Sequence, residues 1–158
     1  MRVVVLIVVL ALASIGSAQS AHPGMRLTVT RVAPTGGFTA NGFLVVHTTT
    51  IHRTPAPECG VGAMRIDAEG HDARGRIRSA HIVAIARAEE GAVDVGTGPC
   101  AARIEVALED GALVVTRGTV RAHLVGGSGL DATLDGSVID AAGVPTTVTG
   151  HIVLSPAP

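Results

Sequence analysis

Residues 101–125 decide the fold, and they read AARIEVALEDGALVVTRGTVRAHLV. In the first part of this stretch Ile104, Val106 and Leu108 alternate with charged or small residues. An apolar residue at every second position is typical of a strand with one buried face, because successive side chains point to opposite sides of a sheet. The pattern therefore predicts a strand that packs these three side chains inward.

The pair Asp110-Gly111 follows this strand and favours a type I′ turn, in which both central residues have positive φ. Such a turn sets three cross-strand pairs: Glu109 with Ala112, Leu108 with Leu113, and Val106 with Val115. The apolar residues of both strands then share one face, so turn chemistry and hydrophobic pattern agree on the register.

A third strand is predicted at residues 119–125, with Val120, Ala122 and Leu124 inward, and we expect it to continue the meander. Short strands separated by turn residues fill the rest of the chain, at residues 26–32, 38–50, 63–67, 76–90, 92–95, 130–139 and 145–154. A charged loop is expected at residues 68–75. This spacing predicts an all-β fold, an antiparallel β-sandwich or a small β-barrel of about nine or ten strands.

Residues 38–50 carry apolar side chains at consecutive positions, such as Phe43 and Leu44, which point to opposite faces of a strand. Apolar residues on both faces indicate a central strand that is covered on two sides. The pair Asn41-Gly42 within it predicts either a bulge or a hairpin turn.

Residues 76–90 are compatible with two structures. Their β-branched residues, among them Ile77, Ile82 and Val83, favour a strand. Ser79 as an N-cap and the alanines that follow suit one helix. We favour the strand.

The N-terminus has the features of a secretory signal peptide. Arg2 precedes an unbroken apolar run over residues 3–13, and Gly16-Ser17-Ala18 supplies small residues at a cleavage site. A transmembrane anchor needs about 20 apolar residues, and this run reaches Ser14 too soon. We expect residues 1–18 to be a cleaved signal and residues 19–158 to form a single all-β domain, exported to the periplasm or the extracellular medium.

Composition excludes several classes of partner. The chain has no Trp, no Tyr and two Phe, whereas single-stranded nucleic-acid sites stack bases on aromatic rings and outer-membrane barrels carry aromatic girdles. Its formal net charge of −1 gives no general attraction to polyanions. We therefore expect no nucleic-acid partner and no transmembrane segment in the mature form, and a protein or a small ligand as the partner.

Cys59 and Cys100 are the two cysteines, and each lies in a Pro- and Gly-rich turn before a predicted strand. An even pair in an exported chain predicts a disulfide. The bond would connect two loops at one end of the fold and contribute roughly 4 kcal/mol of stability on the chain-entropy model.

Seven histidines raise the question of a metal site, and His47, His52 and His71 are the candidate ligands. His47 and His52 are five residues apart in an extended stretch. At roughly 3.3 Å per residue they would lie about 16 Å apart on opposite faces, so they could share a metal only if the chain turned between them. Solvent-facing histidines on polar strand faces are the alternative.

No catalytic constellation stands out. There is no Gly-x-Ser-x-Gly motif, phosphate loop or dinucleotide fingerprint, and no catalytic residue or cofactor is predicted. Ser79 and His81 share a face if their segment is a strand. The acidic run from Asp67 to Asp72 lacks the terminal Glu of an EF-hand loop and is expected to be a solvated turn.

These observations favour an exported β-domain without evident catalytic activity that acts as a binding, structural or envelope-associated module. The alternative is a binding protein for a small apolar ligand or a metal ion, and a small secreted hydrolase comes third.

Overall fold

The computed structural model describes residues 22–158, apart from the side chains of residues 48 and 49. It contains ten strands and one short 3₁₀ helix, which confirms the all-β class. The elements are β1 (Gly24–Arg31), β2 (Phe38–Pro55), η1 (Pro57–Cys59), β3 (Met64–His71), β4 (Ile77–Ala86), β5 (Gly91–Asp94), β6 (Arg103–Leu108), β7 (Gly111–Val114), β8 (Arg117–Val125), β9 (Gly129–Ile139) and β10 (Pro145–Leu154). The predicted signal peptide lies outside the described residues.

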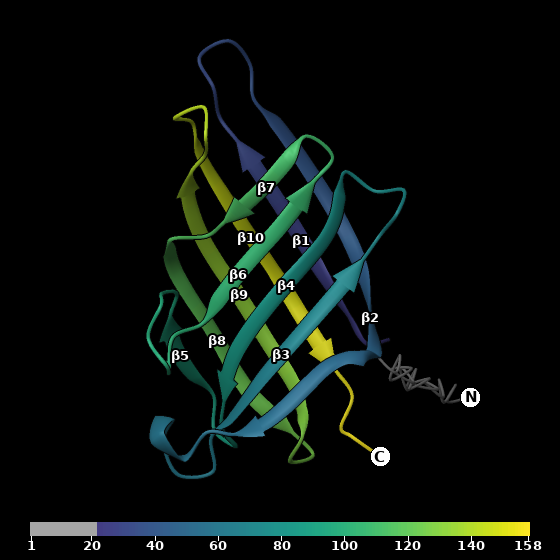
Figure 1. Cartoon of the computed structure of the whole chain (residues 1–158), viewed down its shortest axis with the longest axis vertical. Helices are drawn as coiled ribbons and strands as arrows, with labels where there is room; N and C mark the ends of the chain where they lie inside the picture. The colour runs from purple at the N-terminus through teal and green to yellow at the C-terminus, as the bar shows by residue number, and fades with distance from the viewer. Residues whose placement is uncertain (1–21) are drawn as a thin grey trace, which may run out of the picture.

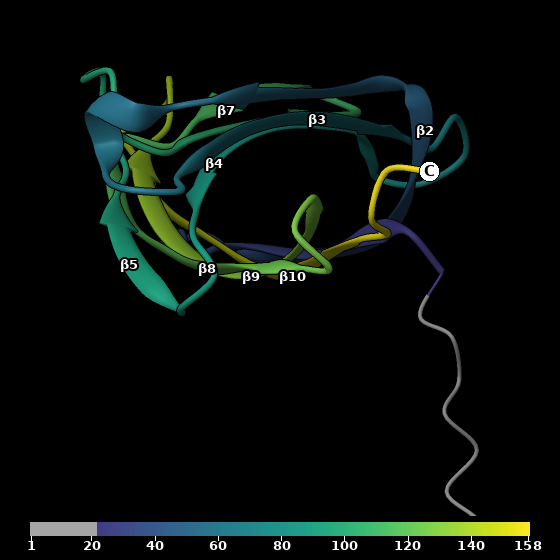
Figure 2. The ribbon, with the colours of Figure 1, turned by 90° about the horizontal axis from the view of Figure 1, so that it is seen from below.

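All ten strands belong to one antiparallel sheet with the order β5-β8-β9-β10-β1-β2-β3-β4-β6-β7. The N-terminal and C-terminal strands are neighbours at its centre, because β1 pairs with β10 over its whole length. The sheet curls into a half-barrel, so that β3, β4 and β7 face β8, β9 and β10 across the core (Figures 1 and 2). Backbone contacts join the two halves near the end of β4, where the amide of Leu124 donates to the carbonyl of Arg87 at 2.6 Å.

Several elements form where the period-2 pattern predicts them. Residues 76–90 contain β4, so the strand interpretation is correct and the helix interpretation is wrong. Pro145 opens β10, where its missing N–H removes no bond from the interior of the sheet. Along β10 Val148, Ile152 and Leu154 are buried, as the alternation predicts.

The hairpin of β6 and β7 has a different register from the prediction. Leu108 pairs with Gly111 and Val106 with Leu113, so the turn residues are Glu109 and Asp110. No non-glycine residue in the described part of the chain has positive φ, which rules out a type I′ turn at Asp110-Gly111. The amide of Glu109 instead donates to the carbonyl of Arg76 at 3.0 Å, across to the segment before β4. The buried and exposed faces of both strands are nevertheless as expected. The pairing is shifted by two residues, and an even shift keeps each side chain on the same face.

The meander does not continue from β7 into β8. β8 pairs with β9 and β5, whereas β7 pairs with β6. Residues 115 and 116 cross from one half of the sheet to the other: the Val115 amide bonds to Ile104 and the Thr116 amide to Ser137. The inward positions predicted for β8 hold, since Val120 and Ala122 are each 1% exposed.

The long strand β2 is covered on one face only. Leu44 and Val46 are buried, but Phe43 is 40% and Val45 48% exposed on the outer face, so the prediction of cover on both sides is wrong. Pairing is regular at Asn41 and Gly42. The irregularity lies further along, between Val46 and Ile51.

The predicted charged loop at residues 68–75 is also shorter than expected. β3 continues to His71, because Ala68 and Gly70 face inward and Glu69 and His71 face outward. The turn that follows is closed by Asp72, whose Oδ1 accepts a hydrogen bond from the amide of Arg74 at 2.9 Å.

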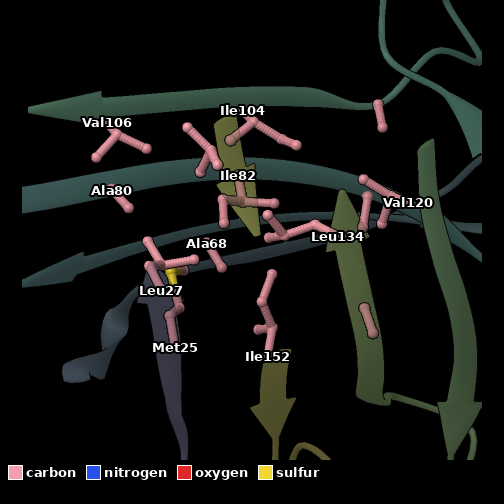
Figure 3. Packing of buried hydrophobic residues seen from close by; sticks show 14 of the residues in the cluster. Met25, Leu27, Ala68, Ala80, Ile82, Ile104, Val106, Val120, Leu134 and Ile152 are labelled. Atoms are coloured by element: carbon pink, nitrogen blue, oxygen red, sulfur yellow. The ribbon is translucent and has the colours of Figure 1, made fainter. Parts of the chain in front are cut away.

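The core lies between the two facing halves of the sheet and is apolar (Figure 3). Among the buried residues of the described chain, Asp140 and Thr146 are the polar or charged ones. Large and small side chains alternate across strands: Leu27 on β1 lies in register between Gly42 on β2 and Gly150 on β10. Such alternation lets side chains from the two halves interdigitate at the density of a protein interior.

Inward glycines mark where the space is already filled. A Cβ at Gly42 would lie 3.1 Å from Cβ of Ile77, which reaches over from β4. A Cβ at Gly70 would lie 2.7 Å from Cβ of Leu44. The inner surface is therefore packed at these glycines rather than lining an open lumen.

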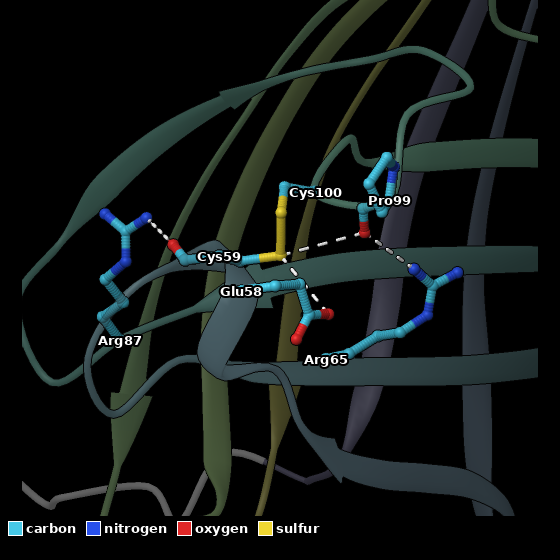
Figure 4. The surroundings of a disulfide bond; sticks show 6 residues. All are labelled: Glu58, Cys59, Arg65, Arg87, Pro99 and Cys100. Carbon is cyan, nitrogen blue, oxygen red and sulfur yellow. Dashed lines mark hydrogen bonds between the residues drawn. A yellow bond between two sulfur atoms is a disulfide. The ribbon is translucent and has the colours of Figure 1, made fainter.

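The Cys59–Cys100 disulfide is present, as predicted, and connects η1 to the loop between β5 and β6 (Figure 4). It joins residues 41 positions apart. Two arginine side chains stabilise the same region. The guanidinium of Arg87 donates to the carbonyl of Cys59 in η1, and the guanidinium of Arg65 donates to the carbonyl of Pro99 at 3.2 Å.

We expect Gly70→Ala to lower the free energy of unfolding by roughly 1–3 kcal/mol, because the new methyl group overlaps Leu44. Gly91→Ala on β5 is the matched control, since nothing lies within 4 Å of its Cβ position. Urea denaturation of both variants measures the difference. Equal stability of the two would contradict the packing described around Gly70.

Cys59→Ser should lower the melting temperature of the oxidised protein, because the unfolded chain regains the entropy that the bond removes, roughly 4 kcal/mol. The same substitution should change little when a reductant is present. Thermal unfolding under both conditions tests this. An unchanged melting temperature in the oxidised sample would show that the bond adds no stability.

Candidate functional site

Histidine and carboxylate side chains gather on the outer face of β3, β4 and β6. His81 on β4 pairs in register with Glu69 on β3 and with Glu105 on β6. Its Nε2 lies 2.6 Å from Oδ1 of Asp67, and its Nδ1 lies 3.8 Å from Oε2 of Glu105. We call Asp67, Glu69, His81 and Glu105 the His81 cluster.

Strand alternation explains why these residues meet. Ile66 and Ala68 point into the core, so Asp67 and Glu69 point outward, and Ile82 places its neighbour His81 outward in the same way. The side chains of His81 and Asp67 are 38% and 37% exposed. Pairs at this exposure contribute little to folding, and these side chains are partly open to solvent.

The irregularity in β2 brings two further histidines to this side of the sheet. Before it the even-numbered residues such as Leu44 and Val46 face inward, and after it Ile51 pairs with inward-facing Ala68. His47 and His52 therefore both lie on the outer face, and the expectation that they point to opposite faces is wrong. The hydroxyl of Thr50 lies 2.8 Å from the carbonyl oxygens of both His47 in the bulge and Glu69 on β3. These contacts connect the bulge to β3.

His71, the third candidate ligand, is also on the outer face. It lies beside Val45, and its Nε2 is 3.3 Å from Oε1 of Glu69. Within residues 22–158 no three histidine, cysteine or carboxylate side chains are grouped closely enough to hold a metal ion. The structure thus brings His47, His52 and His71 to one face of β2 and β3 without joining them at one point.

Ser79 shares the outer face of β4 with His81, as the strand interpretation predicts. Both line a shallow depression of about 310 Å³ together with Glu69, Glu105 and the outer surface of β7. The described contacts of His81 are to carboxylates, and none is to the Ser79 hydroxyl. The activated hydroxyl of a nucleophilic site is therefore not formed here.

The second charged group lies where β1 ends, beside the β9–β10 turn, and was not predicted. Nε of Arg31 lies 2.7 Å from Oδ2 of Asp140, an ion pair whose alignment falls outside hydrogen-bond geometry. Asp140 also accepts hydrogen bonds from the amides of Ala142 and Val144, each at 2.9 Å, and its side chain is 3% exposed. The guanidinium of Arg31 covers the ring of Phe38 at 4.8 Å. This group connects β1 to the β9–β10 turn.

Comparison with protein-family models finds no match, and neither the curated proteins nor the solved structures give one. Across residues 22–158 no helix has the length and apolar character needed to span a membrane.

The two charged groups should respond differently to loss of a carboxylate. Asp140→Asn should lower the free energy of unfolding by roughly 3 kcal/mol, because it leaves the Arg31 charge without its buried partner. Asp67→Asn should cost less than about 1 kcal/mol, because its pair with His81 is exposed. Chemical denaturation at neutral pH compares them, and a larger cost for Asp67→Asn would contradict the assignment of structural and accessible roles.

Proposed function

We propose that this protein is an exported, disulfide-closed β-domain that acts as a binding, structural or envelope-associated module and binds its partner through the outer surface of the sheet. The observation that carries the proposal is the packed inner face. Inward glycines such as Gly42 and Gly70 are covered by side chains from other strands, which leaves the outer face for recognition.

Export is supported by two independent features. Residues 1–18 have the order of charged start, apolar run and small residues that a signal peptidase recognises. The Cys59–Cys100 bond is a type of bond that persists in oxidising compartments, such as the periplasm and the extracellular medium.

The outer face offers chemistry suited to binding. The His81 cluster presents a histidine among carboxylates beside a shallow depression, and Phe43 and Val45 supply exposed apolar surface on β2. The side chain of Arg26 stacks on Phe43, with Cζ 4.9 Å from the ring centroid. The geometry supports hydrolysis less well, because no hydroxyl is hydrogen-bonded to His81 in the described structure.

Metal binding is the second candidate, and the bulge in β2 favours it. By reversing the inward positions after Val46, the bulge places His47, His52 and His71 on one outer face, where side-chain rotation would be needed to bring them to one ion. A small apolar ligand inside the sheet is less well supported, because side chains already occupy the space over the inward glycines.

Mass spectrometry of protein purified after export from its own host tests these proposals. The denatured mass should correspond to residues 19–158 less two hydrogens, because the signal is removed and the disulfide is formed. The native mass should show the polypeptide without a metal or a small molecule. A retained metal ion would overturn the first proposal in favour of the second candidate, and loss of that ion in a His47→Ala, His52→Ala variant would locate it.

A further inference from the structure

β7 is the last strand of the sheet and has one free edge (Figure 1). It pairs with β6 on one side, and no strand of the described chain pairs with the other. The amide of Val115 donates to the carbonyl of Ile104 on β6. Because hydrogen bonding alternates along an antiparallel pair, the backbone groups of Leu113 also face β6, and those of Ala112 and Val114 face away from it.

The side chains at this edge are apolar and small. Ala112 and Val114 lie on the outer face, where Val114 is 57% exposed, and Leu113 between them is buried. β7 contains no charged residue, no proline and no bulge, which are the usual devices that keep an edge strand from pairing with another chain.

The other edge of the sheet, at β5, carries one of those devices. Asp94 is the last residue of β5, so a charged side chain lies within that strand, whereas none lies within β7. The carbonyl of Asp94 is already occupied, because it accepts a hydrogen bond from the amide of Ala102 at 3.0 Å. The contrast shows that β7 is the edge left open for pairing.

The geometry points to a second copy of this chain as the occupant, paired antiparallel with β7 about a two-fold axis at Leu113. In that register Ala112 of each copy lies opposite Val114 of the other. Ala112 and Val114 are the residues whose backbone groups face outward, so each pair exchanges two N–H to O=C bonds and the dimer gains four. The sheets of the two copies become continuous, and the interface is isologous.

Charge at the two ends of β7 favours the same arrangement. Glu109 and Asp110 precede the strand, and exposed Arg117 follows it. Each of these carboxylates already lies near an arginine of its own chain, Glu109 near Arg78 at 3.2 Å and Asp110 near Arg31 at 3.7 Å, but both remain largely exposed. Antiparallel pairing brings them towards Arg117 of the second copy, which would add to these exposed pairs. Arg117 makes no ion pair with a carboxylate elsewhere in the described residues, so its charge is available to the second copy.

Sedimentation velocity over a concentration series of the oxidised protein tests whether the chain dimerises through β7. We expect a monomer–dimer equilibrium. The double substitution Ala112→Lys, Val114→Lys should raise the dissociation constant at least roughly tenfold, because it sets like charges opposite each other in both pairs. Val61→Lys is the matched control, since Val61 is fully exposed in the turn before β3 and should leave dimerisation unchanged.

Hydrogen exchange gives a readout that identifies the edge. The amides of Ala112 and Val114 should exchange more slowly as the protein concentration rises, whereas the amide of Ala92 on β5 should not. Circular dichroism checks that the lysine variant remains folded. A wild-type protein that stays monomeric at every concentration would overturn the proposal, as would a folded lysine variant with an unchanged dissociation constant.

Discussion

The structure depends on burying one apolar face of a single sheet without a second layer. Most strands have alternating apolar positions, and no α-helix of the described chain covers them. β4 is the exception, because Ile85 on its outer face is also buried, against Ala56, Cys59 and Ala63 around η1. The sheet therefore curls until β3, β4 and β6 face β8, β9 and β10, and the apolar residues of each half cover those of the other. Burial of this kind contributes about 25 cal/mol for each Å² of apolar surface removed from water.

The closeness of the two halves then determines which side chains fit. Gly42 leaves room for Ile77, and Gly136 leaves room for Val115, whose Cγ1 would lie 2.5 Å from an added Cβ. A protein almost without aromatic residues fills such a space with Val, Ile, Leu and Ala, whose small volumes suit a thin core. Chemically varied side chains are consequently placed on the outer face, where the His81 cluster and Phe43 lie.

Local patterns predicted much of this fold. Period-2 alternation located most strands and their inward faces, because it follows which side of a strand is buried. An even pair of cysteines, in a chain predicted to be exported, indicated the disulfide. The pairing of distant strands is not visible in local sequence patterns. β10 lies beside β1, and β8 lies apart from β7, because of contacts between segments that are far apart in the chain. The bulge that reorients His52 was missed because Asn41-Gly42 was the visible signal, whereas the irregularity forms after Val46 and is held by Thr50. The ion pair of Arg31 and Asp140 was missed because its two residues are far apart in sequence.

The contact between Ile77 and Gly42 tests the central claim most directly, because it joins β4 to β2, which are not neighbours in the sheet, just beyond the last β2–β3 pair of Val45 and His71. In the NMR spectrum of the isotope-labelled protein we expect nuclear Overhauser effects between the side-chain methyl groups of Ile77 and the Hα protons of Gly42. Their presence is the result that a curled sheet with a packed interior predicts. Their absence, with Gly42 instead in contact with water, would contradict both the packing and the proposal that binding takes place on the outer face.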